Sequence, residues 1–280
     1  MRFGDFEILP VLDGFFRLDG GAMFGRVPKE IWKKTNPPDK QNRILLALRC
    51  LLIKTGKNNI LIDTGIGSKY NREFLRRFAI DRRIDFEQFL NQHGLSKEDI
   101  NIVINTHLHF DHCGGNTKKI NGQIVPAFPR AKYFIQIGEW GAALLGNLLT
   151  KASYHEEDFL PLRDLGIVEF IKEQAVEIEP GITLFRTGGH TKYHQIVKIE
   201  SAGKKAIYLG DLVPTATHLN YPFVMAYDVE PLETVRKKME ILPEAAENQT
   251  LLIFEHEPKL DAAFIKIKDG KILIKEEVKP

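Results

Sequence analysis

The chain has 280 residues, of which 43% are hydrophobic and 27% are charged, a composition typical of an ordinary soluble globular protein. Its net charge of +2, without a long run of lysine or arginine, argues against nucleic acid as a partner. Two cysteines make no disulfide framework and are compatible with a cytoplasmic location. No segment resembles a signal peptide, and none is apolar enough over a sufficient length to span a membrane.

Short apolar runs of strand length recur along the chain and end abruptly in Asp, His, Gly or Thr. They are NILIDTG (59–65), NIVINTHLHFDH (101–112), ITLFRTGGH (182–190), AIYLGD (206–211) and LLIFEH (251–256). Their β-branched and aromatic residues predict strands. Ligands of open α/β sheets collect at the carboxyl ends of strands, so these runs predict an α/β fold with one site at one edge of the sheets.

Helices are predicted between these strands from the spacing of apolar residues. The stretches concerned are 85–93, 138–149 and 231–247. Gly94 is placed to stop the first helix, and Pro231 suits the first turn of the last one.

The end of the sequence, AAFIKIKDGKILIKEE (262–277), predicts a hairpin with its turn at Asp269 and Gly270. No Ser/Gly-rich linker divides the chain, so residues 1–280 are expected to form a single domain. Loosely similar motifs in the two halves of the sequence suggest a two-fold pseudo-repeat within this domain.

The strand end THLHFDH places three histidines and an aspartate within six positions. His107 and His109 are two residues apart, so their side chains point the same way in an extended chain. After the chain turns, Asp111 and His112 can face a second point nearby. Adjacent Asp111 and His112 cannot easily join both preceding histidines around one tetrahedron, so the motif predicts two metal ions.

Other strand ends supply the further ligands that two metals require. The expected grouping is His107, His109 and His190 on one ion, Asp111, His112 and His256 on the other, and Asp211 bridging both through its two oxygens. A bridging solvent and a metal separation of roughly 3.5–4 Å complete such pairs in two-metal hydrolases. Imidazoles with a carboxylate suit Zn²⁺ best, with iron, manganese and cobalt as alternatives.

These motifs, in this order, resemble the metallo-β-lactamase superfamily. They are THLHFDH (106–112), the GGH that ends at His190, the GD that ends at Asp211 and the EH that ends at His256. The resemblance implies a four-layer αββα sandwich, with two mixed sheets and helices outside, and the same ligand grouping. Asp211 stands where the zinc β-lactamases have a cysteine, and His109 stands where flavodiiron oxidoreductases have a glutamate. The resemblance therefore implies a dinuclear hydrolase that neither cleaves antibiotics nor performs redox chemistry.

A closer resemblance lies outside the ligands. LDGGAMFGRVPKEIW (18–32), TGGHTKYHQ (187–195) and VMAYD (224–228) are similar to the YtnP-type quorum-quenching lactonases, relatives of the acyl-homoserine lactonases. This implies hydrolysis of an ester-like bond, with a lactone as the leading substrate. Attack by a metal-bridging hydroxide would open the ring, while Asp111 orients the hydroxide and passes a proton to the leaving oxygen.

One position departs from the lactonase pattern. Acyl-homoserine lactonases have a tyrosine three residues after the bridging aspartate, and this chain has Pro214 there. His218 and Tyr221 are candidates for the missing donor, and the preferred lactone stays open.

Supporting residues are expected around the ligands. Asp63 and His194 are predicted to contact and orient the metal ligands, each with a purely structural role as the alternative. Cys113 is expected to be a small packed residue rather than a ligand. Four residues are predicted to line the substrate pocket, although aromatic residues are core by default: Phe24, His218, Tyr221 and Phe223.

Three other functions stay open. A thioesterase of the hydroxyacylglutathione hydrolase kind shares the seven ligands, but that family adds a basic helical region where this chain has the predicted hairpin. A phosphodiesterase or phosphotriesterase could use the same metal pair, and a non-catalytic metal-binding module needs no substrate at all. The expected partner is a small ester or lactone, without nucleic acid or membrane, and a homodimer is left open.

Overall fold

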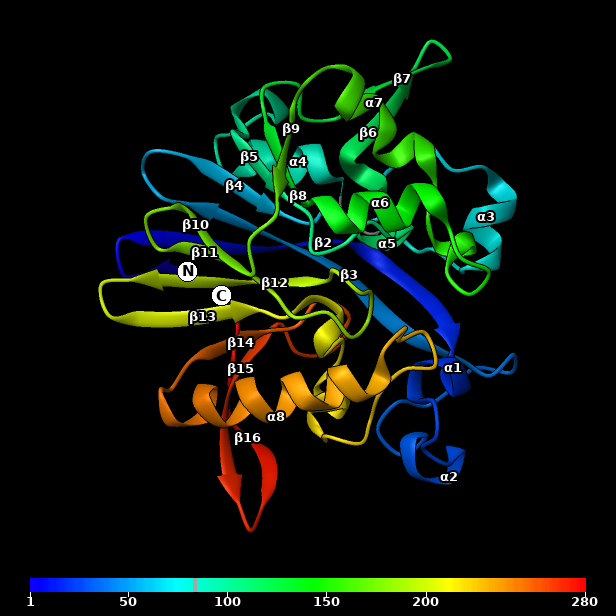
Figure 1. Ribbon diagram of the computed structural model, residues 1–280, viewed down its shortest axis with the longest axis vertical. Helices are drawn as coiled ribbons and strands as arrows, with labels where there is room; N and C mark the ends of the chain where they lie inside the picture. The colour runs from blue at the N-terminus through cyan, green and yellow to red at the C-terminus, as the bar shows by residue number, and fades with distance from the viewer. Residues whose placement is uncertain (83–84) are drawn as a thin grey trace. The chain divides into compact units, whose positions relative to one another are not determined.

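The computed structural model describes residues 1–82 and 85–280, and Figure 1 follows the chain through them. Within these residues the first mixed sheet has seven strands in the order β1-β2-β3-β4-β5-β8-β9. Their bounds are β1 Arg2–Phe3, β2 Phe6–Asp19, β3 Arg43–Lys54, β4 Asn59–Ile62, β5 Ile102–Ile104, β8 Lys132–Gln136 and β9 Val168–Ile171. β4, β5, β8 and β9 run parallel to one another, whereas β1 and β2, and β3 and β4, pair antiparallel.

The second mixed sheet has seven strands in sequence order, β10 to β16. Their bounds are β10 Ala175–Glu179, β11 Ile182–Arg186, β12 Gln195–Ser201, β13 Lys204–Tyr208, β14 Leu251–Ile253, β15 Ala262–Lys268 and β16 Lys271–Val278. β13 and β14 are parallel, and the other neighbours are antiparallel. A separate two-stranded ribbon pairs β6 Thr117–Ile120 with β7 Gln123–Pro126.

Helices connect the strands of both sheets. They are α1 Gly20–Phe24, α2 Lys29–Trp32, α3 Arg72–Arg77, α4 Phe86–Gln92, α5 Phe110–Cys113, α6 Ile137–Leu145, α7 Leu160–Asp164 and α8 Pro231–Glu247. The predicted α/β class with two mixed sheets and helices is confirmed. None of the helices in the described part of the chain combines the length and the apolar character that crossing a membrane requires.

The chain divides into two compact units, each assembled from two segments. Unit 1 comprises Met1–Gly14 and Leu48–Glu173, and unit 2 comprises Phe15–Ala47 and Gln174–Pro280. Strands β2 and β3 therefore contribute residues to both units, which makes the units interleaved in sequence rather than consecutive. The expectation of a single domain over residues 1–280 stays a prediction.

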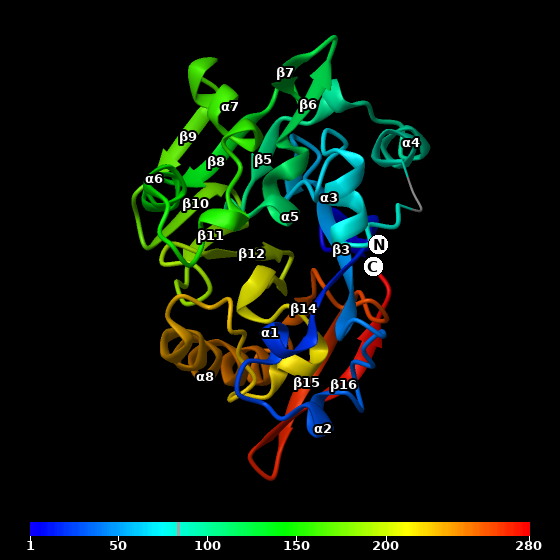
Figure 2. The ribbon, with the colours of Figure 1, turned by 90° about the vertical axis from the view of Figure 1, so that its right-hand side faces the viewer.

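Each unit buries its own hydrophobic core. In unit 1, residues of β3, β4, β5 and β8 pack with α4, α6 and the segment around Phe159. In unit 2, Ile241, Leu242 and Ala245 of α8 pack with residues of β12 to β15, and Figures 1 and 2 both show α8 beside β15. These cores hold the strands whose carboxyl ends carry the predicted ligands.

Local sequence signals account for most helix ends. α4 begins after Asp85, whose side chain accepts the Glu87 N–H at 2.8 Å, and Gly94 follows it in the left-handed region at φ 71°. α8 matches the predicted stretch 231–247. The prediction over 138–149 runs four residues too far, because Gly146 adopts a φ of 52° and ends α6 at Leu145.

The predicted C-terminal hairpin is present as β15 and β16. Asp269 and Gly270 both have positive φ, 51° and 70°, which is the conformation of a two-residue type I′ turn.

Candidate metal centre

The parallel pairing of β4 and β5 brings two polar strand ends together in unit 1. Ile62 pairs with Ile104, so Asp63 and Thr106 emerge at the same edge of the sheet. The Asp63 carboxylate accepts the Thr106 N–H at 2.8 Å and the Thr106 hydroxyl at 2.7 Å. Asp63 adopts a φ of 53°, a strained conformation for a non-glycine residue, and strain of this kind clusters at functional sites.

The motif THLHFDH leads from β5 into the single turn of α5. The ring centroid of His107 lies 4.5 Å from that of His109 and 3.9 Å from that of His112. His112 Nε2 lies 3.9 Å from a carboxylate oxygen of Asp111. All four side chains are at least nine-tenths buried. Unit 1 therefore gathers three imidazoles and one carboxylate, as the spacing predicts.

Asp63 also fixes the orientation of one histidine of the motif. Its Oδ2 lies 3.2 Å from His112 Nδ1. A neutral imidazole that donates its Nδ1–H to a carboxylate keeps a lone pair on Nε2, which is the state that binds a metal. Asp63 thus has the placement that its predicted supporting role requires.

Close approach of the backbone explains the two glycines after the motif. Neither Gly114 nor Gly115 has a positive φ, so a turn is not the reason for them. A Cβ on Gly115 would lie 2.1 Å from the Thr64 carbonyl oxygen, and one on Gly114 would lie 2.4 Å from that of Ile66. Glycine at both positions therefore lets the segment after α5 lie directly against residues 64–66, which follow β4.

Cys113 lies within the same segment but has the surroundings of a packed thiol. It is fully buried, and its Sγ donates to the Leu108 carbonyl oxygen at 3.3 Å. Burial raises the pKa of the Cys113 thiol well above its ordinary value, with Asp158 acting in the same direction. A thiol held protonated is a poor metal ligand, in agreement with the expectation from the sequence.

Unit 2 gathers its three predicted ligands at one sheet edge. β13 and β14 are parallel, with Tyr208 paired to Ile253, so the chain leaves both strands on the same side toward Asp211 and His256. β12 is antiparallel to both β11 and β13, so the β11–β12 loop that carries His190 lies at that same edge. The strand-end pattern of the sequence thus produces convergence within the unit.

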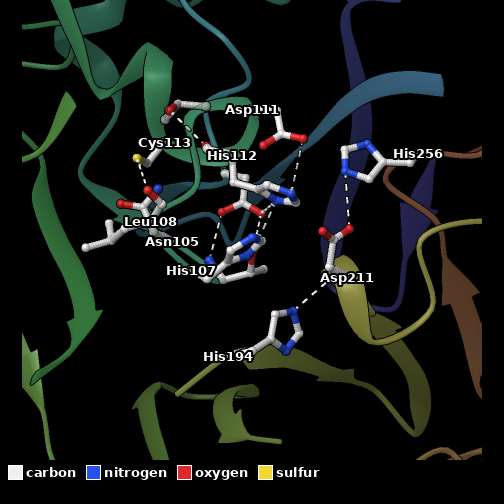
Figure 3. A network of polar contacts seen from close by, with 12 residues as sticks. Asn105, His107, Leu108, Asp111, His112, Cys113, His194, Asp211 and His256 are labelled. Atoms are coloured by element: carbon white, nitrogen blue, oxygen red, sulfur yellow. Dashed lines mark hydrogen bonds and ion pairs between the residues drawn. The ribbon is translucent and has the colours of Figure 1, made fainter. Parts of the chain in front are cut away.

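Asp211 presents one carboxylate oxygen to each of the two histidines. Its Oδ2 lies 3.1 Å from His190 Nε2, and its Oδ1 lies 3.2 Å from His256 Nε2. Figure 3 shows the carboxylate of Asp211 facing the His256 ring. A carboxylate that offers its two oxygens in two directions is the geometry of a bridging ligand.

The other nitrogen of each ring is held by an acceptor. His190 Nδ1 lies 3.0 Å from Oδ1 of Asp228, and His256 Nδ1 lies 2.7 Å from the Ala47 carbonyl oxygen. Both rings therefore donate from Nδ1, and their Nε2 lone pairs face carboxylate oxygens. Two acceptors at such distances repel unless a cation or an added proton lies between them, so this donor set fits divalent metal ions.

His194 contacts the main chain of the bridging aspartate rather than a ligand ring. Its Nε2 accepts the Asp211 N–H at 3.1 Å, and its Nδ1 lies 2.7 Å from the Thr187 hydroxyl (Figure 3). The ring is fully buried. His194 is therefore placed to position Asp211, which specifies the supporting role expected from the sequence.

Two supporting groups escaped the sequence prediction. Asp228 lies in the VMAYD stretch, which was noted only for its resemblance, and an aspartate that follows a strand by many residues carries no local signal. The Ala47 carbonyl belongs to β3 and lies 209 positions before His256 in the sequence. Only tertiary structure reveals such partners.

The predicted pocket residues form an aromatic group in unit 2. The ring of Phe24 stacks on Trp32 at 5.3 Å and on His218 at 4.7 Å, and the Phe223 ring meets Phe24 edge-on at 6.2 Å. Tyr221, half-buried, packs against the core beneath α8. The structure thus groups three of the four rings and places the fourth against the core.

Two members of this group are interior rather than pocket-lining. Phe24 is 0% exposed, because it lies between two flat neighbours, and His218 is 1% exposed. His218 Nδ1 lies 2.7 Å from the Thr215 hydroxyl and Nε2 lies 2.8 Å from the Met23 carbonyl oxygen, so both nitrogens are used. Burial lowers the pKa of His218 to about 3, which leaves the ring neutral. The expectation that Phe24 and His218 face substrate is corrected: both are interior, and Phe24 packs edge-on against the half-buried Phe223.

Comparison with known proteins agrees with these features. Residues 47–265 match the model of the metallo-beta-lactamase superfamily. An N-acyl homoserine lactonase from a Bacillus species is 30% identical over 167 residues, which are 56% of this chain and 59% of the relative. The matched part thus spans about three fifths of that lactonase.

Solved structures extend the comparison to the whole chain. A probable metal-dependent hydrolase from Staphylococcus aureus superposes with a TM-score of 0.92 at 33% identity, covering 99% of this chain and 98% of that one. AidC, described as a dizinc quorum-quenching lactonase in complex with a product, superposes with a TM-score of 0.80 at 21% identity, covering 100% and 96%, and shows the shared fold. Because the matched residues 47–265 make up more than half of the sequence, the chain belongs to the metallo-beta-lactamase superfamily.

Proposed function

We propose that the protein is a dinuclear metal-dependent hydrolase that opens lactones. The observation that carries this proposal is the carboxylate of Asp211, whose two oxygens face the Nε2 atoms of His190 and His256 separately. The seven ligands expected from the sequence would hold two ions, and Zn²⁺ suits this mixture of imidazole and carboxylate. The N-acyl homoserine lactonase relative and the dizinc lactonase of the same fold support this choice.

Bound metal would supply a hydroxide nucleophile at neutral pH and polarise the substrate carbonyl. The protein's own side chains would orient the nucleophile and transfer its proton. Asp111, anchored by the turn of α5, would hold the nucleophile through its carboxylate and accept its proton during attack on the carbonyl carbon. When the ring C–O bond breaks, Asp111 would return that proton to the leaving alkoxide oxygen, giving a hydroxy acid.

The rest of the site would keep the ligands in their metal-binding tautomers. Asp63 would hold His112, Asp228 would hold His190, and His194 would fix the main chain of Asp211. Loss of such supporting hydrogen bonds typically weakens metal affinity by about 10–100-fold.

Pro214 occupies the position of the lactonase tyrosine, and its carbonyl oxygen accepts the His256 N–H at 3.0 Å. It therefore positions a ligand and supplies no side-chain donor to substrate. The half-buried Tyr221, which the structure leaves with part of its surface exposed, is the better candidate of the two named from sequence. We further propose a cytoplasmic location, since Cys50 and Cys113 are both buried and are not joined in a disulfide.

A substrate panel on metal-quantified protein tests the proposed function. Lactones of several acyl lengths, S-lactoylglutathione and a phosphotriester would be compared by kcat/KM on the same preparation. We expect the highest value with a lactone, since one relative is an N-acyl homoserine lactonase and the structure has the β15–β16 hairpin after His256. A higher value with S-lactoylglutathione would replace the proposal with a thioesterase. Two bound metals without turnover of any ester, thioester or phosphoester would indicate a metal-binding module.

A further inference from the structure

A buried lysine of α8 reaches into the segment that follows the bridging aspartate. Lys238 is 0% exposed, yet its neighbours on the same helix face, Ile241 and Leu242, belong to the apolar core. Its Nζ donates to the carbonyl oxygens of Asn220, Tyr221 and Phe223 at 2.7, 3.3 and 2.9 Å. Burying an ammonium costs free energy unless it is fully hydrogen-bonded, so apolar packing alone does not account for a lysine at this position.

The number of acceptors identifies the state of the amine. A protonated lysine has three N–H donors and a neutral one has two, so three carbonyl partners match the ammonium. Burial lowers the pKa of Lys238 to about 7, and the charge of Asp228 acts in the opposite direction. The three carbonyl oxygens surround the Lys238 nitrogen as oxygen ligands surround a small bound cation. The Lys238 ammonium occupies the place of that cation.

The carbonyls belong to a segment whose other attachments lead to the metal ligands. We call residues 218–228 the selectivity segment. Its Met225 N–H donates to Asp228 Oδ2 at 3.2 Å, and the other oxygen of Asp228 holds His190. Its Ala226 N–H donates to the Ala22 carbonyl oxygen at 2.8 Å, and a Cβ on Gly25 would lie 2.7 Å from the Val224 carbonyl oxygen.

These contacts fix one end of the selectivity segment and leave the other end to Lys238. Residues 224–228 are tied to the loop around α1 and to the partner of a ligand, whereas the carbonyls of Asn220, Tyr221 and Phe223 accept from the Lys238 amine. Tyr221 and Phe223 are the half-buried rings of this end. Without the ammonium, the carbonyls of Tyr221 and Phe223 would lose the Lys238 donor, and that of Asn220 would keep only the Phe223 N–H at 3.0 Å, so the turn that presents both rings would lose its fixed shape.

We propose that Lys238 is a positioning residue that sets the conformation of Asn220–Phe223 and thereby the acyl preference of the enzyme. This rests on the proposed function, because acyl preference presupposes an ester or lactone substrate. In the described part of the chain, Lys238 donates to these three carbonyl oxygens and not to a proposed metal ligand, so its effect is expected on substrate recognition and not on metal content.

Lys238→Met tests this proposal against a matched control on the same helix, Lys237→Met. Lys237 is also buried, but its Nζ pairs with Glu240 at 2.8 Å and not with the selectivity segment. Chymotryptic cleavage after Phe223, followed by mass spectrometry, reports the segment without any substrate, whereas the bond between Tyr221 and Pro222 resists this protease. We expect Lys238→Met to be cut about 10-fold faster than wild type, the effect of losing roughly one buried hydrogen bond, and Lys237→Met within about twofold.

Steady-state kinetics separate positioning from a general loss of stability. In Lys238→Met we expect KM for the preferred lactone to rise about 10-fold, with kcat within about threefold and metal content unchanged, and the preference among acyl lengths to flatten. Cleavage and KM equal to wild type would overturn the proposal. So would a lower melting temperature with unchanged KM and acyl preference, or equal effects in Lys237→Met.

A second variant keeps the test decisive if Lys238→Met folds poorly. Lys238→Ala leaves space for a small cation, so ammonium chloride is expected to slow the cleavage and lower KM, whereas tetramethylammonium chloride at equal ionic strength is not. Equal effects of both salts would contradict the proposal. If wild type hydrolyses no lactone, the proposed function fails while the cleavage result stands, and KM is compared on whichever ester the panel identifies.

Discussion

Asp211→Ala is expected to abolish lactone hydrolysis and to reduce bound metal below two ions per chain. The reason is that its two oxygens face His190 and His256 separately, so one substitution removes a donor from both proposed sites. The loss of affinity should exceed the roughly 10–100-fold that removal of a supporting hydrogen bond costs. Metal analysis after dialysis, with kcat/KM measured on the same sample, checks this.

The control for Asp211→Ala is Asp269→Asn in the turn between β15 and β16. Asp269 is exposed, and asparagine accepts its positive φ of 51°. This variant should keep both metal and activity. An Asp211→Ala protein that retained two ions and wild-type turnover would show that the carboxylate is not a bridging ligand.

Asp111→Asn is expected to lower kcat by about 10²–10⁴-fold, the usual contribution of a general acid–base group. An amide keeps the size of the side chain and one oxygen, but it neither accepts the proton of the nucleophile nor delivers it to the leaving oxygen. The metal content should fall by less than in Asp211→Ala, because His112 and the other histidines remain. Pre-steady-state turnover on metal-quantified protein measures the chemical step.

Leaving-group dependence distinguishes this role from simple ligation. Esters with acidic leaving groups need little protonation, so the defect of Asp111→Asn should shrink for an activated aryl ester. A matched control, Asp164→Asn on the exposed end of α7, should behave as wild type. A defect of equal size on both leaving groups would argue against proton delivery by Asp111.

Much of the site could be predicted because its ligands sit directly at strand ends. Ile104 and His107, like Tyr208 and Asp211, are close together in sequence, so the chain between strand end and ligand has little conformational freedom. The order of the strands therefore predicts that the ligands converge within each unit. The hairpin at Asp269 and Gly270 and the bounds of α8 follow from equally local signals. The end of α6 differs from the prediction because Gly146 ends the helix although apolar residues follow it.

What could not be predicted depends on contacts between distant segments. Asp228 and the Ala47 carbonyl meet histidines far away in sequence, and no local pattern marks them. Lys238 reads in sequence as an ordinary charged residue of an amphipathic helix, and its burial depends on three carbonyls of another segment. Phe24 was expected to line a pocket because glycines surround it, but stacking against Trp32 and His218 makes it interior.

The most direct test of the central claim is a metal titration of apo-protein followed by lactone hydrolysis. A chelator would remove the metal, and Zn²⁺ would be returned in steps while bound metal and initial rate are measured together. We expect lactone turnover to be lost with the metal and to return in full only as the second ion binds to each chain. Full lactone hydrolysis by the metal-free protein, or by protein with a single ion, would contradict it.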